Sequence, residues 1–152
     1  MVEGGRHEVT SLATEARSCA GDAHALSEMV HRDILDIREG LPSRGESEQG
    51  RFIRFMADRL ADRLNGLQTI IRRDPKVAAA APSGWSIGDE AFRLWGLARA
   101  LRWLVTVDKG LTGKPSEQDT YAIQCLADQV ANNATGLAQD IEHCPAARTR
   151  LN

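Results

Sequence analysis

The chain has 152 residues, a formal net charge of −2, 42% hydrophobic residues and 26% charged residues, a composition typical of one globular domain spanning 1–152. This charge excludes the strongly basic composition of many nucleic-acid-binding proteins and gives no general attraction to an anionic membrane. The three cysteines are too scattered for a disulfide framework, and no apolar run is long enough to span a membrane, so we expect a cytoplasmic protein with no membrane partner.

The first predicted helix covers about residues 8–39. Its apolar residues recur at alternating spacings of three and four, which places them on one helix face. The stripe consists of Val9, Leu12, Ala16, Cys19, Ala23, Leu26, Val30 and Ile37. Asp33 interrupts this stripe, so we expect the seam to shift onto Ile34. Gly40 and Pro42 should end the helix.

The second predicted helix covers 47–73 and ends before Pro75, because the residue that precedes a proline disfavours helical geometry. Its apolar stripe consists of Ile53, Met56, Leu60, Leu64, Leu67 and Ile71. The alanine run 78–81 before Pro82 can add one short helical turn.

The third predicted helix covers 86–108, with Ser86 and Asp89 as an N-cap pair. The fourth covers 116–143, begins at the capping residue Ser116 and is followed by a loose tail over 145–152. The apolar stripe of the fourth helix consists of Ile123, Ala127, Val130, Ala134, Leu137 and Ile141.

The long helical patterns with short connections predict an all-α fold, because no segment shows the alternation of a strand. The simplest packing is an antiparallel four-helix bundle with up-down-up-down topology. Cys19, Cys125 and, less clearly, Cys144 fall on apolar stripes. We therefore expect all three to be buried as small hydrophobic side chains.

The third helix is unusual because it carries two apolar faces. All three tryptophans lie within this helix or directly before it. One face is an ordinary core stripe of Ile87, Ala91, Leu94, Ala98, Leu101 and Val105. The second consists of Trp85, Phe92, Gly96, Ala100, Trp103 and Val107, bordered by Arg99 and Arg102. Either both faces are buried at the bundle centre, or the second is exposed and docks a partner helix or a second copy of the chain. For the docking interpretation, the predicted partner-binding residues are Trp85, Phe92, Gly96, Arg99, Ala100 and Trp103.

Charge is distributed unevenly along the chain. The second helix and its end are rich in arginine, whereas the fourth helix is acidic and contains no Lys or Arg. The pattern predicts internal complementarity between helices and pairs such as Arg54 with Asp58, or else a docking face for an acidic partner or a phosphate backbone. Asp58 and Asp62 beside Arg59 and Arg63 dilute any basic strip, which argues against nucleic acid.

Chemistry-bearing motifs are weak. His24, Glu28 and His31 share a row on the first helix and could contribute to a metal site, but the Glu-x-x-His motifs of di-metal bundles are missing from the other helices. Gly110–Lys114 lacks the spacing of a phosphate-binding loop, and no catalytic signature is present. We predict no cofactor, no metal and no enzymatic activity.

The resulting functional prediction is a non-enzymatic protein–protein interaction module, a small regulator, adaptor or inhibitor. It would dock a protein partner, or a second copy of itself, through the aromatic face of the third helix. The alternative is a small-molecule- or metal-binding helical bundle, with a pocket beside Trp95 or Trp103 or a site at His24, Glu28 and His31.

Overall fold

The computed structural model describes the backbone of residues 2–38, 48–108 and 117–144, and the side chains of 12–33, 51–105 and 121–144. Over these ranges the protein is all-helical, without a strand. The helices are α1 (Val2–Arg38), α2 (Glu48–Arg72), α3 (Pro75–Ala79), α4 (Ile87–Asp108) and α5 (Glu117–Glu142). Thus α1 begins at Val2 instead of near residue 8, and the alanine-rich connection contains α3. The tail predicted over 145–152 lies outside the described residues.

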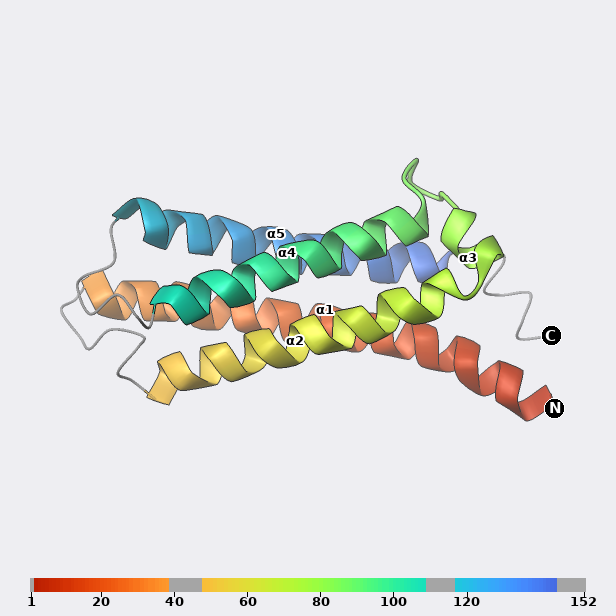
Figure 1. Cartoon of the computed structure of the whole chain (residues 1–152), viewed down its shortest axis with the longest axis horizontal. Helices are drawn as coiled ribbons and strands as arrows, with labels where there is room; N and C mark the ends of the chain where they lie inside the picture. Colours follow the sequence, from red (N-terminus) through yellow and green to blue (C-terminus); the bar gives the residue numbers. More distant parts are fainter. Residues whose placement is uncertain (1, 39–47, 109–116, 145–152) are drawn as a thin grey trace.

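The four long helices lie along the long axis of the molecule, and short α3 connects α2 to α4 at one end (Figure 1). α1 packs against α5 and α2, and α4 packs against α2 and α5. Within the described ranges, no helix combines the length and apolar character needed to cross a membrane.

The core forms where the apolar stripes of these helices meet. The predicted stripes of α4 and α5 are buried in full, and α1 and α2 contribute most of theirs. The largest fully buried side chains are Leu26, Ile53, Leu60, Leu64, Leu67, Ile71, Ile87, Leu94, Leu101, Ile123 and Leu137. Burial of such side chains is the main force that holds amphipathic helices together.

Two predictions about the stripes need correction. Cys19 and Cys144 are buried, but Cys125 is exposed. The reason is that residue 125 lies about 200° around the helix from the core residue Ile123 and so points to solvent. Asp33, which was expected to be bypassed by the seam, is itself buried; the side chain of Ile34 lies outside the described residues.

The connection between α2 and α4 is tightly built. The Asp74 carboxylate accepts hydrogen bonds from the backbone N–H groups of Lys76 and Val77 and so caps α3. Gly88 allows α4 to approach α3 closely, because a Cβ at this position would lie 3.1 Å from the carbonyl oxygen of Ala78. Gly84, at φ +98°, supplies the left-handed turn that leads into Trp85 and α4.

Candidate functional site

The start of α4 positions the first of the predicted docking residues. Ser86 lies directly before Ile87, and its Oγ accepts a hydrogen bond from the backbone N–H of Asp89 at 3.1 Å. This confirms the predicted N-cap, which satisfies a backbone donor left unpaired in the first helical turn. Trp85 therefore directly precedes a capped helix N-terminus.

The two faces of α4 have opposite environments. The stripe that contains Leu94 and Leu101 is buried in the core. On the second face, Trp85 is 59% exposed, Phe92 is 50% exposed and Trp103 is 63% exposed. The interpretation that both faces are buried at the bundle centre is therefore wrong. The side chain of Val107 lies outside the described residues.

The exposed face of α4 is hollowed into a groove of about 720 Å³. Its lining residues are Asp58, Phe92, Trp95, Gly96, Arg99, Ala100, Arg102 and Trp103. Trp85 does not line this groove, but it borders a second hollow of about 230 Å³ with Glu90, Arg93, Asn132, Asn133 and Gly136. Five of the six predicted residues thus meet in one groove, and Trp85 lies outside it.

Small residues form the floor of the groove between Phe92 and Trp103. Gly96 and Ala100 are exposed, and a Cβ added at Gly96 would meet no atom within 4 Å. Gly96 is therefore not needed for helix packing within the described part of the chain. Glycine inside a helix costs about 0.5–1 kcal/mol relative to alanine, so this position carries a destabilising residue that the described fold does not require.

Three arginines around this face stack on aromatic rings. The Cζ atom of Arg99 lies 5.0 Å from the ring centroid of Trp95, that of Arg72 lies 5.4 Å from Phe92, and that of Arg93 lies 5.7 Å from Trp85. These are cation–π distances. Sequence reasoning singled out Arg99 but missed Arg72 and Arg93. Arg72 belongs to α2, so only the tertiary structure brings it to Phe92.

An ion pair closes one side of the groove. Asp58 on α2, the residue expected to pair with Arg54 in its own helix, pairs with Arg102 on α4 across 3.7 Å between Oδ1 and Nε. This exposed pair contributes little stability, but it neutralises the aspartate that lines the groove. Arg102 therefore joins α2 to α4 instead of bordering the face as a free cation.

Further exposed apolar residues lie on α2 and were not singled out from the sequence. Phe52 and Phe55 are exposed and stack with ring centroids 6.3 Å apart, and Ile70 is also exposed. The available signal was their position off the predicted α2 stripe, where a helix that is amphipathic in the usual sense carries polar residues. The exposed large apolar residues of the described chain thus gather mainly on α2 and α4.

A carboxyl pair lies near the Trp85 end of α4. The Ser83 Oγ lies 2.8 Å from Asp140 Oδ2 and 3.2 Å from Glu90 Oε1, so its single proton is shared between the two carboxyl groups. This contact links the α3–α4 connection to α4 and α5. Burial raises the pKa of Glu90 to about 7; the neighbouring Asp140 carboxyl adds to the rise and the Ser83 hydrogen bond opposes it.

The histidine row on α1 faces polar side chains of α5. His31 contacts Asp128 through Nε2 and Gln124 through Nδ1, each at 2.8 Å. His24 Nε2 lies 2.8 Å from the hydroxyl oxygen of Thr135. The same hydroxyl lies 3.1 Å from the Ala131 carbonyl oxygen, to which it donates. Within the described residues, no group of three or more His, Cys, Asp or Glu side chains is arranged to hold a metal ion.

Asp128 also accepts a hydrogen bond from the Ser27 hydroxyl at 2.7 Å. Partial burial acts to raise the pKa of Asp128, but the hydrogen bonds from Ser27 and His31 outweigh it, so the pKa lies below its usual value. Since the serine donates to the aspartate and not to the histidine, these residues do not form a nucleophilic triad.

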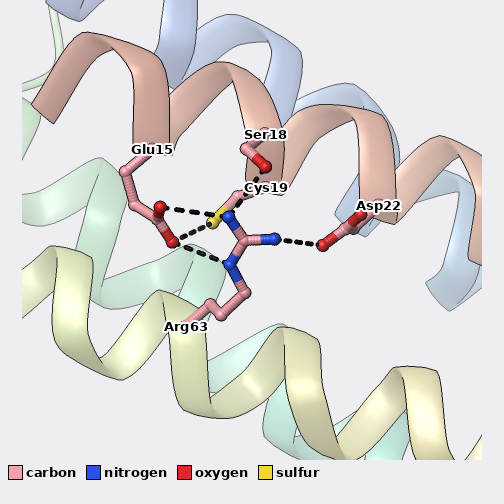
Figure 2. Close-up of polar contacts among 5 residues, drawn as sticks. All are labelled: Glu15, Ser18, Cys19, Asp22 and Arg63. Carbon is pink, nitrogen blue, oxygen red and sulfur yellow. Dashed lines mark hydrogen bonds and ion pairs between the residues drawn. The ribbon is translucent and has the colours of Figure 1, made fainter. Parts of the chain in front are cut away.

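The strongest charge cluster joins α1 to α2. Figure 2 shows the Arg63 guanidinium between Glu15 and Asp22, with Ser18 behind it. Arg63 makes a two-pronged contact with Glu15, through Nε at 2.7 Å and Nη2 at 3.0 Å, which is the strongest ion-pair geometry that arginine offers. Hydrogen bonding to Arg63 lowers the pKa of Glu15. This confirms the predicted charge complementarity between helices for Arg63.

Cys19 lies in the same cluster and donates weakly to Glu15. Burial raises the pKa of the Cys19 thiol to about 12, and the nearby Glu15 carboxylate adds to that effect. A thiol that stays protonated is a poor nucleophile and a poor metal ligand. We therefore interpret the Arg63 cluster as a structural tie.

The chain matches no protein-family model, no curated protein and no solved structure. The functional argument therefore rests on the geometry of the α4 face.

Proposed function

We propose that this protein is a non-enzymatic protein-interaction module, a small regulator, adaptor or inhibitor, that docks a helix of a protein partner in the groove along α4. The observation that carries the proposal is the half-exposed state of Phe92 and Trp103 on α4, a helix whose opposite face supplies the core, with exposed Trp85 just before its first residue. Exposed aromatic surface of this kind marks interaction sites, and tryptophan is a frequent energetic anchor in them.

The shape of the groove supports a helix as the occupant. Phe92 and Trp103 stand about 16 Å apart along α4, roughly three helical turns. Between them, Gly96 and Ala100 leave room for the backbone of a second helix to approach closely. An amphipathic helix that places its apolar stripe in such a groove is a common recognition mode.

The alternative, a small-molecule- or metal-binding bundle, has less support. Small ligands are usually held in concave pockets that bury most of their surface, whereas the α4 groove is lined largely by exposed side chains. His24 and His31, the proposed metal ligands, already have hydrogen-bonding partners on α5.

The proposal includes the architecture: one domain, an antiparallel four-helix bundle with up-down-up-down topology. Two contacts support it, because Asp58 in the first half of α2 meets Arg102 in the second half of α4, and Arg72 at the end of α2 meets Phe92 near the start of α4. The free thiols of Cys19, Cys125 and Cys144 agree with a cytoplasmic location.

Site-specific photo-crosslinking in cells tests the docking face. A photoreactive phenylalanine analogue replaces Phe92, which keeps a ring at one end of the groove and leaves the small-residue floor open, and a matched control places it at exposed Ala25 on α1. We expect a discrete crosslinked protein from position 92 and none from position 25. A second chain with Trp103→Ser added should lose the crosslink and keep its thermal unfolding, because Trp103 is 63% exposed.

Equal crosslinking from both positions contradicts the proposal. So does a crosslink from position 92 that persists unchanged after Trp103 is replaced. Loss of the fold in the Trp103→Ser variant would show that this ring is structural, which also contradicts it.

A further inference from the structure

We infer that the helix docked on α4 is acidic, with glutamate or aspartate residues flanking its apolar stripe. This inference rests on the proposed function and adds the chemistry of the partner. Its basis is the state of the arginines Arg72, Arg93 and Arg99.

Each of these guanidinium groups lies over a ring, at 5.0–5.7 Å from the ring centroid. Among the described residues, none of the three forms an ion pair. A stacked guanidinium uses its flat face, so its N–H donors remain directed outward around its edge. Such a group is held in place and can still grip a carboxylate with two parallel hydrogen bonds.

Two of these cations lie at the groove, since Arg99 lines it and Arg72 contacts Phe92 at one end. Arg93 lies beyond that end, over Trp85 in the neighbouring hollow. Asp58, the acidic residue that lines the groove, is paired with Arg102. The local surface is therefore an apolar floor with unneutralised positive charge beside it, which is complementary to an amphipathic acidic helix.

The same features disfavour two other occupants. A second copy related by a two-fold axis would place the same arginine-bearing patch on both sides of the interface, with no acidic surface to complement it. A phosphate backbone would find an apolar floor with only a few cations beside it, whereas nucleic-acid sites converge many cations on one strip.

The test uses the full chain and two short helical peptides with the same leucine stripe, one flanked by glutamates and one by lysines. Tryptophan fluorescence and calorimetry measure binding. We expect the glutamate peptide to bind saturably and at least about tenfold more tightly than the lysine peptide. Replacing Arg72, Arg93 and Arg99 together by glutamine should remove most of that preference.

The substitution Gly96→Leu should block the groove without destabilising the fold. Since nothing lies within 4 Å of the added Cβ, the variant should fold at least as stably as the parent chain, yet fill the groove and abolish peptide binding. Gly21→Leu is the matched control, because Gly21 is an exposed helical glycine of α1 with equally open surroundings.

Other results overturn the inference in distinguishable ways. If both peptides bind equally and Gly96→Leu blocks both, the groove docks a helix without selecting acid, so only the inference fails. It also fails if the chain self-associates in light scattering and Gly96→Leu abolishes that state. Binding to phosphatidylserine vesicles in place of the glutamate peptide, or no binding of that peptide, likewise rejects it. Peptide binding that survives Gly96→Leu would discredit the groove itself, and the crosslink from position 92 would then decide the proposed function independently.

Discussion

The seams that α1 forms with α5 and α2, and the outer surface of α2 and α4, use polar and aromatic residues in different ways. At the α1–α5 seam, side chains on one helix meet partners on the other, as in the contacts of His31 with Asp128 and of His24 with Thr135. On the α2–α4 surface, large rings stand in solvent and arginines lie over them.

The comparison is sharpest for two arginines. Arg63 reaches from α2 to the carboxylates of Glu15 and Asp22, whereas Arg99 meets only the face of Trp95 among the described residues. Arg63 is therefore paired with carboxylates of the same chain, whereas Arg99 keeps hydrogen-bond donors that no described carboxylate accepts from. Charge that the fold satisfies internally indicates structure, and charge held rigid beside an apolar groove indicates recognition.

The largest expected effect separates these two arginines. Arg63→Met should lower the free energy of unfolding by about 2 kcal/mol, because Glu15 and Asp22 would lose their partly buried counter-charge. Arg99→Met should change it by less than about 0.5 kcal/mol. Urea unfolding of both variants measures the difference, and equal losses would erase the distinction between the two regions.

A smaller effect concerns a contact between α4 and α5 where the carboxyl groups of Glu90 and Asp140 meet. The pKa of Glu90 is about 7 in the folded chain, against an ordinary value of 4.5. The fold therefore favours the protonated form, and the stability gained by protonation is full below about pH 4.5 and is lost as the pH rises through about 7. Because the pair is partly open to water, we expect a loss of about 1 kcal/mol.

Glu90→Gln removes this titration. Its free energy of unfolding, measured from about pH 5 to about pH 8, should fall less steeply than that of the parent chain. Asp140→Asn serves as the companion variant, because it removes the neighbouring charge and should also flatten the profile. Parallel profiles for the parent chain and Glu90→Gln would show that Asp140 and burial do not shift this group. Asp128 has the opposite sign: its lowered pKa means that its contribution is lost only in acid.

The core could be predicted from the sequence because it follows from local periodicity. Leu94 and Leu101 lie on an apolar stripe that helical periodicity reveals directly. The N-cap at Ser86 can be recognised from the few residues that follow it. Cys125 shows the limit of this method, because a residue two positions from a core residue points away from the core.

The candidate site could be predicted only in part. A helix that is apolar nearly all round has no unique inner face, so periodicity left open whether Trp103 was buried or exposed. The contacts of Arg72 with Phe92 and of Arg63 with Glu15 join different helices. Such pairings depend on which helices become neighbours and on their register. The spacing of residues within one helix determines neither.

The smallest effect on stability is expected for a substitution on α2. It tests where the docking surface ends. Phe55 is exposed and lies one helical turn before Asp58, which lines the groove. Phe55→Ser should change the free energy of unfolding by less than about 0.5 kcal/mol, whereas Ile53→Ala, at a fully buried neighbour, should cost about 2–5 kcal/mol. If Phe55 is a rim residue, its loss should weaken binding of the glutamate peptide by less than about fivefold. A loss of peptide affinity beyond about tenfold would show that the residues dominating binding extend from α4 onto α2. A large loss of stability would instead show that Phe55 is a structural residue.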